Sequence, residues 1–193
     1  MIVGSTKEDL KLEKRVSLTP ETAKNIIGLG LQVCIEKGYA NHLGIQDSEY
    51  KEVGVEIKAS SNEILNSSRA IIKVNCPSEN EINYLKENTI LIGMFNPSKN
   101  KDKIDKIKNK KIKIFSLELL PRITRAQSMD VLSSQSNLAG YRAVIECIAE
   151  FEKAVPMMMT AAGTVPAAKV LVIGAGVAGL QAIATAKRLG AIV

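Results

Sequence analysis

The stretch KVLVIGAGVAGLQAIATAKRLG, residues 169–190, decides the fold of this chain. Residues 170–173 form a continuous apolar run, as expected of a strand that is buried on both faces. Three glycines follow in GxGxxG spacing, and the helix-forming sequence LQAIATAKR continues to Gly190. A strand, a glycine-rich turn and a helix in this order predict the first unit of a doubly wound parallel sheet.

Each glycine of the motif has a physical role in binding a dinucleotide. Gly174 permits the tight turn, Gly176 lets the backbone approach a pyrophosphate, and Gly179 lets the helix pack close to the strand. The helix that begins near Val177 directs its amides at the phosphates. The acidic residue for the adenine ribose is expected roughly 20 residues after the glycines, beyond Val193. The sequence is therefore expected to be an N-terminal fragment that holds the truncated start of this domain.

Composition and charge narrow the class of protein. The 193 residues are 46% hydrophobic, which is typical of a globular protein, and no apolar run is long enough to span a membrane. The net charge of +6 equals the surplus of eight lysines over two aspartates in residues 99–113, which are predicted to form a surface helix. This segment has no aromatic residues to stack on bases, so nucleic acid is not expected as a partner. No signal peptide is evident, and Cys34, Cys76 and Cys147 are too scattered for a metal site or disulfide, so reduced core thiols are expected.

Upstream of the glycine motif, short apolar runs alternate with helical segments. The runs start near residues 2, 31, 55, 70, 90 and 112, while Thr19-Pro20-Glu21 and the spacing of Ser60 and Glu63 are typical of helix starts. This alternation predicts parallel βαβ units. The expected organisation is a Rossmann-like (flavodoxin-like) α/β domain at 1–132, a connecting helix at 133–155, a hinge, and the start of the dinucleotide-binding domain at 160–193.

Three segments resemble the alanine dehydrogenase/pyridine nucleotide transhydrogenase family. They are RVSLTP at 15–20, IIKVNCP around Lys73, and the long stretch from PRITRAQSMDVLSSQSNLAGYRAV at 121–144 through the glycine motif. The last segment is similar to the NAD-binding subunits of proton-translocating transhydrogenases. The resemblance covers essentially the whole chain.

The resemblance implies which residues contact NAD. It assigns the catalytic positions beside the nicotinamide to a polar loop, with Arg122, Gln127, Asp130 and Ser133. From the residues alone, the same loop also fits a connector in which Ser133 or Ser134 caps the next helix. The full set of implied cofactor contacts is Arg122, Ile123, Thr124, Arg125, Gln127, Asp130, Ser133, Gly174, Gly176, Val177, Ala178 and Gly179.

Within the family two activities compete. Alanine dehydrogenases use an arginine, a lysine and a histidine over the substrate, and Arg15 and Lys73 match the first two. The chain has one histidine, His42, whereas Phe95 and Asn96 stand where the catalytic histidine is expected. Without that imidazole the expected general acid is missing. Arg15 and Lys73 are therefore interpreted as a remnant of a substrate site.

The resemblance implies the NAD(H)-binding component of a proton-translocating NAD(P)+ transhydrogenase, in which hydride transfer between NADH and NADP+ is coupled to proton movement. NADP(H) would bind a partner domain or subunit, beside membrane-spanning subunits. The chain would be a peripheral homodimer on the cytoplasmic side of a bacterial inner membrane, or on the matrix side in mitochondria, and the fragment alone is expected to be inactive. The alternatives are an alanine dehydrogenase-like oxidoreductase and a non-catalytic NAD-binding module.

Overall fold

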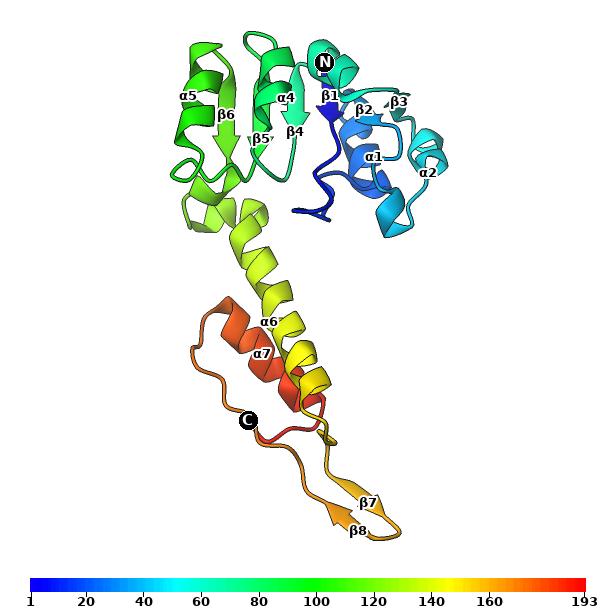
Figure 1. Cartoon of the computed structure of the whole chain (residues 1–193), viewed down its shortest axis with the longest axis vertical. Helices are drawn as coiled ribbons and strands as arrows, with labels where there is room; N and C mark the ends of the chain where they lie inside the picture. The colour runs from blue at the N-terminus through cyan, green and yellow to red at the C-terminus, as the bar shows by residue number, and fades with distance from the viewer. The chain divides into compact units, whose positions relative to one another are not determined.

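The computed structural model describes all residues from 1 to 193, and the chain divides into two units, Met1–Pro121 and Arg122–Val193. The first unit contains a six-stranded parallel sheet (Figure 1). Its order, β3-β2-β1-β4-β5-β6, is that of the Rossmann fold and differs from the flavodoxin order. The predicted α/β class is confirmed. The strands are β1 (Ile2–Ser5), β2 (Gln32–Glu36), β3 (Glu56–Lys58), β4 (Ala70–Ile72), β5 (Ile90–Gly93) and β6 (Lys113–Ser116).

The sheet of the first unit has an apolar core on each face. Successive residues of a strand point to opposite faces, and β2 shows this clearly. Cys34 packs with the helices that follow β3, β4 and β5, whereas Val33 and Ile35 pack with the two helices that precede β3. Burial on both faces explains why the inner strands β1, β2, β4 and β5 appear in the sequence as apolar runs.

Side-chain caps define the helix starts in the first unit. Thr19 accepts a hydrogen bond from the Thr22 amide at the start of α1, and Ser60 accepts one from the Glu63 amide at the start of α3. Both starts were predicted. The helices are α1 (Pro20–Gly28), α2 (Asp47–Glu52), α3 (Ser61–Ser67), α4 (Glu79–Tyr84) and α5 (Lys101–Asn109), with short 3-10 helices at Asn41–Leu43 and Leu117–Leu119.

The second unit pairs two helices. A 3-10 helix (Thr124–Met129) leads into α6 (Val131–Glu150), and α7 (Val177–Arg188) follows later in the chain. The two helices lie side by side and run in the same direction (Figure 1). None of the helices in the structure is both long and apolar enough to cross a membrane.

Three details of the second unit differ from the sequence-based expectation. The segment expected as a hinge contains an antiparallel hairpin, β7 (Met158–Thr160) and β8 (Gly163–Val165). Residues 170–173 form no strand, and Leu171 and Ile173 are exposed; the bridge next to them pairs Lys169 with Ile192, too short a pairing for a ladder. Cys147 is exposed, so it is not a core thiol.

The division of the chain also differs in position from the predicted domains. The boundary between the units follows Pro121, and the boundary predicted after residue 132 lies within α6. The helix predicted for 133–155 runs from Val131 to Glu150. The polar loop expected to contact NAD therefore belongs to the same unit as the glycine motif.

Gly93 on β5 offers a test of the packing in the first unit. A Cβ at this position would lie 2.2 Å from the Lys73 carbonyl oxygen and 2.6 Å from the Phe95 ring. We expect Gly93→Ala to lower the free energy of unfolding by about 2 kcal/mol, because a backbone oxygen cannot rotate away. Gly28→Ala, whose added methyl would meet no atom within 4 Å, should cause no loss. Urea denaturation of both variants measures the difference, and equal stability would contradict the packing described here.

Candidate functional site

The glycine-rich turn of the second unit has the geometry that phosphate binding requires. Gly174 has a φ of 108°, a left-handed conformation that favours glycine. A Cβ on Gly179 would lie 2.1 Å from the Gly174 carbonyl oxygen, so the turn closes tightly only with glycine there. A Cβ on Gly176, the middle glycine of the motif, would meet no atom within 4 Å, so packing within the chain does not require glycine there. A ligand that approaches the backbone at Gly176 does require it.

The first turn of α7 presents unpaired donors beside that turn. Its N-cap is Gly176, which has no side chain to accept a hydrogen bond from the first amides. Those amides have no acceptor within the helix. Val177 and Ala178 are exposed, so the amide groups and the positive end of the helix dipole are available to an anion. These features fit the pyrophosphate of a dinucleotide.

The polar loop before α6 is held by a cap. The Asp130 carboxylate accepts hydrogen bonds from the Ser133 amide at 2.9 Å and from the Ser133 hydroxyl at 2.7 Å. These bonds, with the nearby Arg122, lower the pKa of Asp130 below its usual range. Arg122 and Asp130 form no ion pair within 4.0 Å. Asp130 therefore caps the helix, whereas the sequence left this role to Ser133 or Ser134.

The same loop projects polar side chains into solvent. The 3-10 helix is anchored by Ala126, which is buried, while Arg122, Arg125 and Gln127 are exposed. The exposed guanidinium and amide groups are donors that remain available to a ligand. All four predicted catalytic positions lie in the segment 122–133, and the structure adds a hydrogen-bonded contact only between Asp130 and Ser133.

The parallel packing of α6 and α7 places the loop and the glycine-rich turn at the same end of the helix pair. Gly140 lies against Ala178, and one turn later Val144 clusters with Ala182 and Ala186. Val131, the first residue of α6, is nine residues before Gly140, or roughly 14 Å along the helix. The glycine-rich turn is level with Gly140 on α6, and the polar loop lies beyond it, at the N-terminal end of α6.

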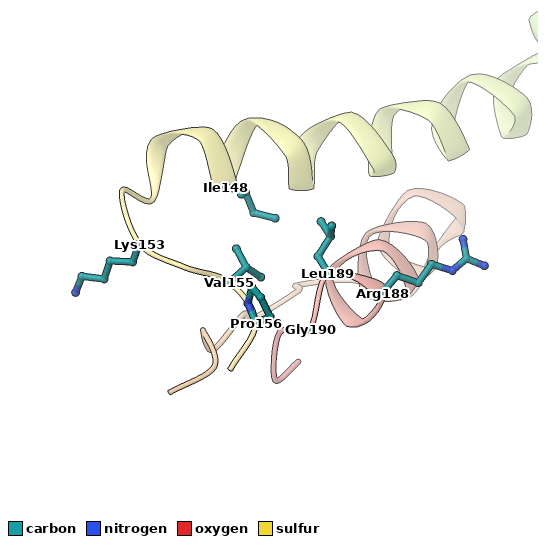
Figure 2. A pocket seen from close by; sticks show the side chains of 7 residues that line it. All are labelled: Ile148, Lys153, Val155, Pro156, Arg188, Leu189 and Gly190. Carbon is teal, nitrogen blue, oxygen red and sulfur yellow. The ribbon is translucent and has the colours of Figure 1, made fainter. Parts of the chain in front are cut away.

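A cavity of about 570 Å³ lies at the opposite end of the helix pair. Figure 2 shows Ile148, Val155 and Leu189 directed toward one another, while Lys153 and Arg188 point away. A nucleotide site needs converging polar groups, and this apolar space offers none. The cavity is not the candidate site.

In the first unit, carboxylates surround the lysine that was interpreted as a remnant. The Lys73 ammonium group is almost fully buried and donates to Glu81 Oε1 at 2.7 Å and to Thr6 Oγ1 at 2.9 Å. Glu8 Oε2 lies 4.0 Å away, and its other oxygen accepts the Val74 amide at 2.8 Å. This cluster joins the chain after β1 to the chain after β4.

The two carboxylates of the cluster have opposite pKa shifts. Burial raises the pKa of Glu8, and the attraction of Lys73 only partly offsets this effect. Burial would also raise the pKa of Glu81, but Lys73 and hydrogen bonds from Ser78 and Thr6 lower it below its usual range. Glu81 is therefore the stable counter-ion of the buried lysine.

The other residues of the supposed substrate site are also engaged within the chain. Arg15 pairs with Glu13 at 2.6 Å, and that hydrogen bond raises the pKa of the guanidinium group further. Phe95 is fully buried, and the exposed Asn96 adopts a φ of 48°. His42 lies on an exposed 3-10 helix and bonds to the Lys14 carbonyl oxygen at 2.7 Å. No imidazole lines the roughly 410 Å³ pocket beside Lys73.

Comparison with known proteins agrees with the two-part architecture. The model of the alanine dehydrogenase/PNT N-terminal domain matches residues 4–139, and the model of the corresponding C-terminal domain matches residues 143–193. The chain belongs to this family. The predicted family resemblance is thereby confirmed.

The similar proteins of this family include transhydrogenase subunits. The chain is 46% identical over 198 residues to a Rhodospirillum rubrum protein named as one part of NAD(P) transhydrogenase subunit alpha, covering all of this chain and 52% of that protein. It is 47% identical to the protein of the same name from Rickettsia prowazekii, again over the whole chain and 51% of the relative. The structure of transhydrogenase from Sinorhizobium meliloti matches with a TM-score of 0.94 at 47% identity, over 99% of this chain and 57% of that one. The chain spans about half the length of the curated relatives it matches.

The sequence interpretation missed two features of these sites. Glu8 and Glu81 were not recognised as partners of Lys73, because neither carboxylate is close to the lysine in the sequence. Gly140 was treated as an ordinary helix position. A glycine inside a long helical pattern often has a packing reason, and that signal was available.

The ion pair of Lys73 and Glu81 predicts a pH-dependent stability. The pKa of Glu81 is lower in the folded protein than in the unfolded chain, where it is near 4.5. The ionised carboxylate therefore stabilises the fold fully at pH values above 4.5, and this contribution is lost as the pH falls from 4.5 through the folded pKa. We expect Glu81→Gln to lower the free energy of unfolding by about 3 kcal/mol at pH 7, because Lys73 loses its close partner. The difference from wild type should shrink below pH 4.5.

Glu79→Gln is the matched control on the same helix. Glu79 pairs with Lys106 on the surface, where both side chains are solvated, so its loss should have little effect. Denaturant unfolding across the pH range compares the variants. The ion pair would be contradicted if the loss in free energy of unfolding caused by Glu81→Gln did not change with pH. The range to compare runs from neutral pH to about one pH unit below the unfolded pKa of Glu81.

Proposed function

We propose that this chain is the NAD(H)-binding part of a proton-translocating NAD(P)+ transhydrogenase. The observation that carries the proposal is the placement of the glycine-rich turn and the polar loop at the same end of two parallel helices. A dinucleotide bound at the turn can then extend its nicotinamide toward Arg122 and Gln127. Relatives named as a part of transhydrogenase subunit alpha match the whole chain and support the same assignment.

In this proposal each element has a defined role in binding and orientation. The amides of Val177, Ala178 and Gly179 hold the pyrophosphate. The nicotinamide supplies the hydride when it is bound, so the protein's own contribution is orientation. Gln127 and Arg122 are free to donate to the nicotinamide ribose and carboxamide, and Ser133, fixed by Asp130, offers an oxygen acceptor to the amide. Ile123, Thr124 and Arg125 complete the loop.

The acceptor of the hydride lies outside this chain in the proposal. NADP(H) binds a separate NADP-binding subunit, and membrane-spanning subunits carry the proton. The chain works as a homodimer, peripheral to the membrane on its cytoplasmic face, or on the matrix face in a mitochondrion. The names of the relatives, which describe one portion of an alpha subunit, support the existence of such partners.

An alanine dehydrogenase-like activity is the second candidate, since the family includes those enzymes. Three observations weigh against it. Phe95 and Asn96 replace the expected histidine, Lys73 is held by Glu81 and Glu8, and Arg15 is held by Glu13. We infer that Arg15 and Lys73 have a structural role here. A non-catalytic NAD-binding module is the third candidate, and turnover assays distinguish it.

The choice between these functions can be tested with the full-length protein. We expect no oxidation of L-alanine with NAD+, because no imidazole lines the Lys73 pocket and the lysine is already paired with Glu81. We expect hydride transfer from NADH to an NADP+ analogue when the NADP-binding component is added. Absorbance assays measure both reactions. Alanine turnover would establish the dehydrogenase activity, and NADH binding without either reaction would establish the binding module.

The role of the polar loop can be tested by separating rate from affinity. Gln127→Asn retracts the amide by one methylene, so we expect hydride transfer to fall at least about tenfold, or roughly 1.4 kcal/mol of barrier. The NADH dissociation constant should change by less than about threefold, because phosphate and adenosine contacts remain. Gly176→Val should show the reverse, with weakened binding first, because its side chain blocks the approach of the pyrophosphate.

Single-turnover transfer and equilibrium NADH binding provide the two measurements for Gln127→Asn and Gly176→Val. An unchanged transfer rate in Gln127→Asn would mean that the loop is only a connector. Unchanged NADH binding in Gly176→Val would remove the turn from the site.

A further inference from the structure

The helices α6 and α7 touch backbone to backbone at a single glycine. Gly140 is buried, and a Cβ added there would lie 2.1 Å from the Ala178 carbonyl oxygen. The next nearest atoms, the Ala178 carbonyl carbon and Cα, would be 2.9 and 3.0 Å away. All three are backbone atoms of the first turn of α7. No side-chain rotation can make room for a methyl group, so only a movement of one helix against the other can.

This contact joins the two halves of the candidate site. On one side, α6 is a continuous helix whose N-terminus is capped by Asp130 and carries the polar loop. On the other side, Ala178 lies two residues after Gly176, within the turn of amides proposed to hold the pyrophosphate. The separation of loop and turn is therefore fixed where Gly140 meets Ala178.

The helix interface continues through side chains. One turn further on, Val144 meets the small side chains of Ala182 and Ala186. Thr185 turns its hydroxyl back to the Gln181 carbonyl oxygen at 2.8 Å. These contacts are made by side chains, whereas the contact at Gly140 is made by backbone atoms.

We propose that Gly140 is a positioning residue for hydride transfer, which sets the distance between the phosphate-binding turn and the nicotinamide-binding loop. The inference rests on the proposed function of these two segments. Gly140 itself touches no nucleotide in this scheme. It acts through the first turn of α7.

The proposal separates binding from chemistry in a specific way. An ordinary contact for a Cβ lies beyond about 3.4 Å, so Gly140→Ala must move the helices apart by about 1 Å. The turn from Gly174 to Gly179 is closed by its own internal contact and moves with α7 as a unit. The adenosine and phosphate contacts are then preserved, while the nicotinamide is displaced from the loop. A misplacement of about 1 Å at the reacting atoms is enough to cost up to about a hundredfold in rate.

The test uses the full-length protein with its NADP-binding component and three variants. Gly140→Ala adds the methyl group at the contact, and Ala139→Ser adds one atom at an exposed neighbour on the same helix. Val144→Ala loosens the same interface without pushing the helices apart, so it controls for lost stability. Each protein is measured for ADP binding, NADH binding, single-turnover hydride transfer and thermal unfolding.

We expect Gly140→Ala to bind ADP within about threefold of wild type and to transfer hydride at least about tenfold more slowly. Val144→Ala should unfold at a lower temperature yet keep its transfer rate, and Ala139→Ser should match wild type. Equal transfer in Gly140→Ala and wild type would overturn the proposal. A parallel loss of ADP binding and transfer would overturn it as well, and so would failure of Gly140→Ala to fold, since either result makes Gly140 a requirement for folding alone.

A crystal structure of Gly140→Ala separates this inference from the proposed function. It should show the first turn of α7 about 1 Å further from α6. The internal geometry of the Gly174–Gly179 turn should be the same as in wild type. An unchanged helix separation would refute the positioning role whatever the activity. If wild type failed to bind NADH, the proposed function would fail, while the crystal structure would still decide whether Gly140 sets the spacing.

Discussion

Backbone segments approach one another at glycines in both units, and the positions of the functional groups follow from these contacts. In the first unit, a Cβ on Gly93 would lie 2.2 Å from the Lys73 carbonyl oxygen. In the second unit, Gly179 closes the phosphate turn and Gly140 fixes the turn against α6. A side chain at any of these positions would separate elements that native packing density requires to touch.

The fold of the first unit could be predicted because its signals are local. The six strands appear as six short runs rich in apolar residues, and caps such as Thr19 and Ser60 mark helix starts within four residues. The hairpin of β7 and β8 was missed because its methionines are exposed and show no alternation of apolar and polar residues. The strand expected at 170–173 had the right composition, but a ladder depends on a partner strand, which composition does not supply.

The candidate site was only partly visible in the sequence, for the same physical reason. The glycine motif is compact, so its spacing alone predicts the turn at Gly174. The polar loop has no such internal pattern, and only resemblance singled it out. The partners of Lys73 are Glu8, 65 residues earlier, and Glu81 on the next helix, so that network exists only after folding. Likewise, the need for glycine at 140 arises from Ala178 on another helix.

Gly176 is the one glycine of the motif that the fold itself does not require. The fold itself accounts for Gly174, through its left-handed backbone, and for Gly179, through its contact with Gly174. Gly176 has an ordinary φ of −75° and open space where a side chain would be, so any small residue would satisfy the fold. It is also the N-cap of α7, where serine, asparagine or aspartate would stabilise the helix slightly more than glycine. A glycine that packing does not require fits the proposed function, in which a pyrophosphate comes close to the backbone at this position.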